Sequence, residues 1–181
     1  RLADYALGGG GFSSRLMQRI RSEMGHTYGI HSFLPLEHVP GPFTIQSFTQ
    51  TGNLGAMLEL IDSELDAVAT EGFTPEEVDD ARMHLHGALP LRLTNPGIIL
   101  HTVADGLLAG LAVDDLETDW HAIRTTTLEQ VNEAAQRLIG DGTFHLALIG
   151  PSRDILPQLE GRGEAAVFPF RTPPDRWREG A

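Results

Sequence analysis

The chain has 181 residues, of which 41% are hydrophobic and 21% charged, a composition typical of one globular domain and not of a disordered or fibrous chain. It contains no cysteine, which excludes disulfides, thiolate nucleophiles and cysteine-ligated zinc. The net charge is −12, all 13 basic residues are arginines, and residues 51–140 hold 4 of them against 16 acidic residues. This pattern offers no basic stripe for nucleic acid. The most apolar stretch, residues 97–113, is interrupted by His101 and Asp105, which argues against membrane insertion.

The first elements are a pair of helices separated by glycines. Residues 1–7 read as the end of a helix, which the glycines at 8–11 are expected to stop. Ser13 or Ser14 can cap a second helix that runs to about Met24. Core residues recur in that helix at helical spacing.

Two strands are predicted next, over residues 27–34 and 43–50, because both are rich in β-branched and aromatic residues. A Pro-Gly-Pro turn at residues 40–42 separates them. The natural interpretation is an antiparallel hairpin or meander.

Several helices follow, each with its own start signal. Asn53 opens an amphipathic helix that Gly72 closes, and Thr74–Glu77 combines a capping box with proline at the first helical position. Residues 94–96 restart a third helix, and after an acidic connection at 114–119 a second capping box begins at Thr127.

The last predicted strand is the apolar run 143–149, and five prolines after residue 150 predict loops. Strands and helices do not alternate as they would in a parallel sheet. The order therefore favours an α+β fold, with a mainly antiparallel sheet packed with helices in two layers.

Two kinds of site can be weighed around the glycine run. A nucleotide site is disfavoured, because the chain has no lysine for a phosphate loop and Ser13 stands where the dinucleotide pattern needs glycine. A serine nucleophile at Ser13 or Ser14 is disfavoured too. The nucleophile-elbow pattern lacks its last glycine, and no carboxylate partner is marked for His26 or His31.

The eight histidines do not predict a metal site. His84 and His86 are two residues apart in a predicted helix and so point about 200° away from each other. Neither His-x-x-Glu-His nor its inverse occurs. We expect no metal in this chain.

Arg21 and Tyr28 are the strongest candidates for chemistry. They lie seven residues apart across the junction of a helix and a strand, where a turn at Gly25 can bring guanidinium and phenol to one surface. Such a pair can grip a peptide carbonyl or stabilise an oxyanion. The alternative is an arginine at a helix C-terminus and a half-buried strand tyrosine, each with a structural role.

The same stretch resembles the second half of the pitrilysin-type (M16) zinc peptidases, the family of insulin-degrading enzyme and mitochondrial processing peptidase. The motifs that carry the resemblance are Leu7–Leu16 (LGGGGFSSRL), Ile20–Tyr28 (IRSEMGHTY), Thr74–Glu77, Gly87–Leu91, Thr127–Val131 and Leu148–Pro151. It implies a domain over about residues 1–150, with its first strands expected to precede Arg1, and a Pro-rich tail over 151–181. The fold expected from it is the LuxS/MPP-like metallohydrolase fold.

The resemblance also implies a two-half enzyme that encloses its substrate. The zinc and its inverted motif would lie in an N-terminal half or a partner subunit, and this chain alone is expected to be inactive. Arg21 and Tyr28 match the Arg and Tyr that the family's second half donates to the peptide substrate. Gly9, Gly10 and Gly11 are similar to part of a substrate-contacting glycine-rich loop, although the run here is short. His26 stands where relatives often carry leucine.

A second function with the same fold is a catalytically silent scaffold or interaction subunit, like the core proteins of respiratory complexes. The presence of both Arg21 and Tyr28 favours the peptidase. The absence of cysteine and the number of secreted bacterial relatives favour the periplasm over the cytoplasm.

Overall fold

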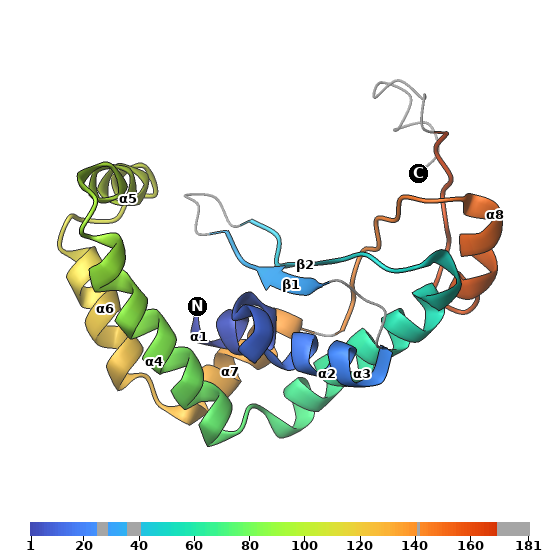
Figure 1. Ribbon diagram of the computed structural model, residues 1–181, viewed down its shortest axis with the longest axis horizontal. Coiled ribbons are helices and arrows are strands. Elements are labelled where there is room, and N and C mark those ends of the chain that lie inside the picture. The colour runs from blue at the N-terminus through green and yellow to red at the C-terminus, as the bar shows by residue number, and fades with distance from the viewer. Residues whose placement is uncertain (25–28, 36–40, 141, 170–181) are drawn as a thin grey trace.

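The computed structural model describes residues 1–24, 29–35, 41–140 and 142–169, without the side chains of residues 21–24, 89, 92 and 116. Its elements form an arch, with a small hairpin on the inner side (Figure 1). In chain order they are α1 (Leu2–Asp4), the π-helical turn η1 (Tyr5–Gly9), η2 (Gly11–Ser13), α2 (Arg15–Met24), β1 (Ile30–Phe33), β2 (Thr44–Ser47), η3 (Thr51–Asn53), α3 (Leu54–Glu71), α4 (Pro75–Arg92), α5 (Pro96–Leu108), α6 (Asp115–Thr125), α7 (Leu128–Ile139), α8 (Ser152–Ile155) and η4 (Leu156–Leu159).

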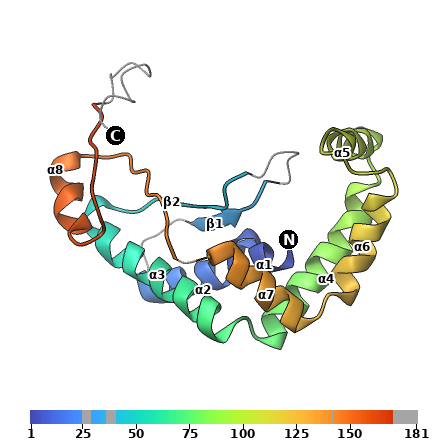
Figure 2. The same cartoon turned by 180° about the vertical axis from the view of Figure 1, so that it is seen from behind.

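The hydrophobic core lies where α1, α2, α3, α7 and the first half of α4 meet. Seen from behind, α7 lies beside α3 and next to α1 (Figure 2), and it contacts both helices. The side chains that are less than 2% exposed come from several of these helices, from η1 and from β1, and include Leu7, Leu16, Ile20, Ile30, Val68, Val78 and Val131. This shared burial makes the centre of the arch one packed unit.

The hairpin covers the inner side of the helices. β1 and β2 pair antiparallel, with Ile30 opposite Ser47 and Phe33 opposite Thr44. Residues alternate along β1, so Ile30 and Ser32 are buried against the helices while His31 and Phe33 are exposed. The α+β class with an antiparallel sheet is confirmed, although each strand is shorter than predicted.

The start signals in the sequence are confirmed as caps. Thr127 Oγ1 accepts a hydrogen bond from Gln130 N, and the Gln130 side chain accepts one from Thr127 N. Thr74 and Glu77 exchange the same pair of bonds at the start of α4. These reciprocal bonds satisfy backbone groups that a helix leaves unpaired at its N-terminus.

The first helical segment continues past residue 7 as a π-helical turn and ends at Gly9, inside the glycine run, as expected. Two expectations were wrong. The acidic connection at 114–119 is mostly helical, since α6 begins at Asp115, whose side chain accepts a hydrogen bond from Ala112 N in the turn before it. The run 143–149 belongs to no strand ladder in the described part of the chain, and Leu146 and Ile149 are exposed. An apolar run becomes a strand only where a neighbouring strand is present to pair with it.

The C-terminal segment returns to the start of α3. Gln158 accepts a hydrogen bond from Gly55 N at 3.0 Å and donates one to Thr51 O at 2.8 Å. Arg162 pairs with Asp62 at 2.5 Å. No helix in the described residues has both the length and the apolarity to cross a membrane.

Candidate functional site

The helix that carries Arg21 is fixed at its start by a salt bridge to α4. Arg15 donates from Nε and Nη2 to the two carboxylate oxygens of Glu77, at 2.6 and 2.5 Å, and also to Gly72 O. Its guanidinium lies 5.1 Å from the centre of the Phe73 ring. Burial by itself would raise the pKa of Glu77, but the hydrogen bonds from Arg15 and Thr74 outweigh it and hold that pKa below its ordinary value of 4.5.

One turn further along α2, a second arginine reaches a different helix. Arg19 Nε donates to Glu64 Oε1 of α3 at 2.6 Å, and Glu64 is buried. A buried carboxylate needs such a partner, because an unpaired charge in the core is costly. Together with fully buried Leu16 and Ile20, the two ion pairs hold α2 against α3 and α4.

The strand that follows is fixed just as firmly. Ile30 is fully buried, and Ser32 Oγ donates to Asp4 Oδ1 at 2.7 Å. β1 lies directly on η1, so a Cβ on Gly8 would stand 2.6 Å from Ser32 N. Gly8 therefore serves this close approach of backbone to backbone.

The three glycines predicted to touch substrate also have local roles. A Cβ on Gly10 would stand 2.7 Å from the Tyr5 ring, and Gly11 has a φ of +58°, which favours glycine. Gly9 and Gly11 are exposed. Contact with a peptide is therefore sterically open at these positions, and it stays a prediction.

Arg21 and Tyr28 themselves are only partly covered by the structure. The Arg21 backbone belongs to α2, but its side chain lies outside the described residues, as do His26 and Tyr28. What the structure describes is their setting. Ile20 and Ile30, the nearest described core residues on either side, are both fully buried in the same core.

The open face of the hairpin adds an aromatic surface beside this junction. His31 and Phe33 project away from the helices, with ring centres 6.4 Å apart. Gln46 stands opposite His31 across the ladder and is exposed too. This face is uncharged when His31 is neutral.

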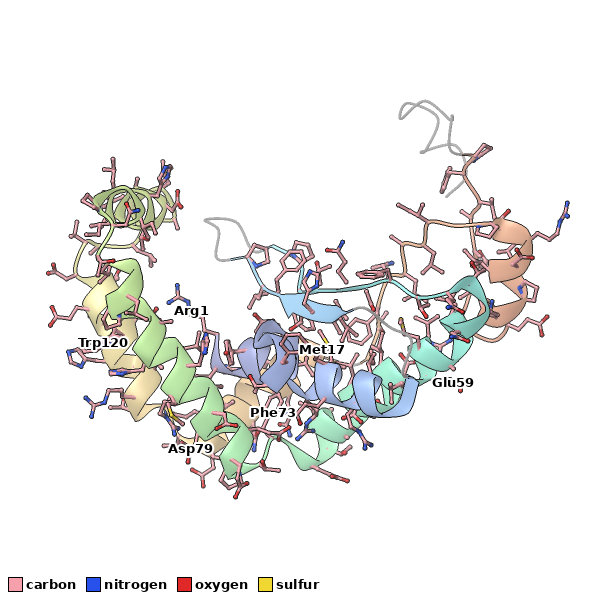
Figure 3. All side chains as sticks on the ribbon, viewed as in Figure 1. Arg1, Met17, Glu59, Phe73, Asp79 and Trp120 are labelled. Carbon is pink, nitrogen blue, oxygen red and sulfur yellow. The ribbon has the colours of Figure 1, made fainter. Side chains whose placement is uncertain are left out.

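The arm formed by α4 and α6 holds the histidines that the sequence singled out. His84 stacks on Tyr5 at 4.9 Å and His86 on Trp120 at 4.4 Å, so the two point to different neighbours as their spacing predicts. Trp120 Nε1 also donates to His86 O, which ties α6 to α4 (Figure 3). No group of three or more His, Asp or Glu side chains among the described residues is arranged to hold a metal ion.

Sequence reasoning missed the residues that position the candidate site. Glu77 was expected only in a helix cap and no role was expected for Arg15 or Arg19, yet these residues lock α2 to α3 and α4. A partial signal exists in the spacing of Arg15 and Arg19, since residues four apart lie on one helix face. Their partners, Glu77 and Glu64, are 62 and 45 residues away and carry no local signal.

Comparisons with known proteins agree on one family. Residues 1–85 match the model of the peptidase M16 inactive domain. The chain is 29% identical to an uncharacterized zinc protease of Streptomyces coelicolor over 149 residues, which covers 81% of this chain and 32% of that protein. It is 30% identical over 142 residues to a non-peptidase homolog of Helicobacter pylori, covering 75% and 32%. The chain thus spans about a third of the length of the curated relatives it matches.

Solved structures support the same assignment. The peptidase M16 inactive domain from Pseudomonas fluorescens superposes with a TM-score of 0.69 at 29% identity, covering 75% of this chain and 32% of that one. A putative zinc protease from Bordetella pertussis, at 20% identity, shares the fold with a TM-score of 0.64 and covers 75% of this chain and 74% of its own. Over residues 1–85 the chain matches the inactive-domain type of the M16 peptidase family.

Proposed function

We propose that the chain is the zinc-less half of a two-half M16 peptidase, which binds extended peptide and supports the oxyanion through Arg21 and Tyr28. The observation that carries the proposal is the anchoring of α2 and β1, the two elements on either side. Ile20 and Ile30 are both fully buried in one core, and ion pairs fix α2 on two sides. Firmly packed flanking elements suit a pair of donors that must be preorganised to act.

The two side chains have complementary tasks. The Arg21 guanidinium, which is always charged, donates to the carbonyl of the bound peptide and holds it in place. The Tyr28 hydroxyl donates to the oxygen on which negative charge develops. Loss of one such donor costs on the order of 10²-fold in rate, about 2.7 kcal/mol. Zinc held by the other half would supply the activated water.

The glycine run is proposed as a second contact with the peptide. Gly9 and Gly11 are exposed, and without side chains they allow another backbone to approach closely. The run precedes the helix α2 that carries Arg21, so a peptide held at Arg21 can extend along it.

The domain limits remain part of the proposal. Residues 1–150 would form the M16 domain, and 151–181 a tail that reaches back to α3 through Gln158.

The test replaces each donor in the complete peptidase, with the zinc-bearing half included. Arg21→Ala and Tyr28→Phe should each lower kcat/KM for peptide cleavage about 100-fold, with unchanged zinc content. Arg137→Ala and Tyr5→Phe are the matched controls, since Arg137 is an exposed arginine of α7 and Tyr5 is the other tyrosine of the chain. Cleavage within twofold of wild type by both site variants would remove the assigned role.

A silent scaffold subunit is the second candidate function. One relative, 30% identical, is described as a non-peptidase homolog. If the complete protein, loaded with zinc, cleaves no peptide in a broad library while wild-type and Arg21→Ala forms assemble equally well, the scaffold function replaces the peptidase.

A further inference from the structure

The end of the α4–α6 arm carries an apolar surface, which we call the apolar tip: Ile99, Leu100, Val103 and Leu107 of α5, with Leu111 and Val113 of the turn that follows. The four α5 residues recur at intervals of one, three and four, so they form one stripe along the helix. Asp105, the one acidic residue of α5, lies on the opposite face. Leu100 is 70% exposed and Leu107 is 53% exposed.

No described element packs substantially on this stripe, although Val103 is half-buried and Ile99 is only 37% exposed. α5 has no buried residue and makes no substantial packing contact with another described element. It sits at the end of the arm, apart from the central core (Figure 1). A 13-residue helix is marginal in water by itself, and most helices gain their stability by packing an apolar face. The stripe therefore has the chemistry of an interface that is covered in the complete protein.

Charge beside the tip limits what can cover it. Asp114, which follows Val113 directly, and Glu117, in the first turn of α6, are exposed, so an acidic rim borders the apolar surface. In a symmetric pair of copies this rim would face its own like charges. Anionic lipid headgroups would repel it as well. The rim instead complements a different polypeptide surface that is basic at its edge.

We infer that the apolar tip docks onto the zinc-bearing half of the peptidase, on a surface that is apolar at its centre and basic at its rim. The inference rests on the proposed two-half function. The chain spans about a third of its relatives' length, so most of such a protein lies outside these residues. A stable association needs a desolvated apolar centre, and the tip is an exposed surface of that kind.

The test measures association of the two halves in the complete peptidase, after cutting an engineered protease site where one polypeptide carries both. Leu100→Glu combined with Leu107→Glu should weaken the Kd between the halves about 100-fold or more, since two buried leucines are replaced by charges. Hydrogen exchange in the uncut wild type should show α5 protected. Asp114→Asn with Glu117→Gln should slow association severalfold and reduce its salt dependence.

Two variants keep the test decisive. Met83→Glu is the matched control, because Met83 is 69% exposed on α4 and lies outside the tip; the halves should remain together. If the double variant fails to fold by circular dichroism, Leu100→Ala, which adds no charge, should still weaken the Kd about tenfold. A Kd within threefold of wild type for folded tip variants would overturn the inference.

The other occupants of the tip give different results. One outcome is that the chain self-associates, that the double variant abolishes this self-association, and that the Kd between the halves is unchanged. That outcome would assign the tip to a second copy of the chain. Binding of wild-type protein to phosphatidylglycerol vesicles that the double variant loses would assign it to a membrane. Both results overturn the inference but do not bear on the roles proposed for Arg21 and Tyr28. The proposed function is tested separately: Arg21→Ala should lose cleavage while the two halves remain joined.

Discussion

Helices α5 and α7 are nearly equal in length, yet they differ in what they bury. α7 has 12 residues and buries Val131, Ala135 and Ile139 in the core. α5 has 13 residues, is richer in large apolar side chains, and buries none of them. Apolar composition thus shows that a helix needs a partner, but it does not show whether the partner belongs to the same part of the chain.

The largest expected effect on the free energy of unfolding comes from shortening one isoleucine in each of these two helices. Ile139→Ala in α7 should lower the free energy of unfolding by about 2–5 kcal/mol, because it leaves a cavity in the core. Ile99→Ala in α5 should change it by less than about 1 kcal/mol, because Ile99 is 37% exposed and lies outside the core. Urea unfolding of the 181-residue chain checks both. Equal losses would mean that α5 packs against the core in solution.

Acid should weaken the ion pair between Glu77 and Arg15, which joins α2 to α4 in the core region. Because the folded pKa of Glu77 lies below its ordinary 4.5, its pairing with Arg15 stabilises the fold fully above that value. The contribution is lost as the pH falls through the lower folded pKa. Glu77→Gln should cost about 1–3 kcal/mol near neutral pH, and the gap to wild type should narrow between about pH 5 and pH 3. The midpoints of urea unfolding across that pH range measure the stability difference between wild type and Glu77→Gln. A difference that stays constant with pH would contradict this prediction.

Removing the N-terminal caps of α7 and α5 should have the smallest effect on stability, and it compares the same two helices again. Thr127→Ala removes the capping box of α7 and should cost about 1 kcal/mol of global stability. Asn95 caps α5 by accepting from Gly97 N, at 2.8 Å. Asn95→Ala should leave global stability unchanged and speed hydrogen exchange within α5. A global loss from Asn95→Ala would show that α5 unfolds together with the core.

The sequence was most informative where its signals are local. Helix starts at Thr74 and Thr127 were predictable because a capping box involves residues three positions apart. The extra helix α6 was missed because acidic residues suit both a loop and the first turn of a helix. The strand at 143–149 was predicted from its apolar run, but a strand needs a neighbour, which no single segment specifies.

The candidate site was predictable as residue types and spacing only. Arg21 and Tyr28 stood out because a charged donor and a phenol lie on two sides of one turn. The anchors Arg15 and Arg19 pair with carboxylates many residues distant, and such pairs follow from the packed fold alone. Gly8 was assigned to a helix end, whereas its backbone contact with Ser32 became visible only when helix and strand were stacked.

The amide of Gln158 has a consequence for how the chain tolerates changes in length. By bonding to both Gly55 N and Thr51 O, it stands in for a missing cap on α3 from a position over a hundred residues later. Adding or deleting one residue between Gly150 and Gln158 would shift this amide out of register with the first turn of α3. Evolutionary insertions in this region should therefore be tolerated after Arg162 and avoided before Gln158.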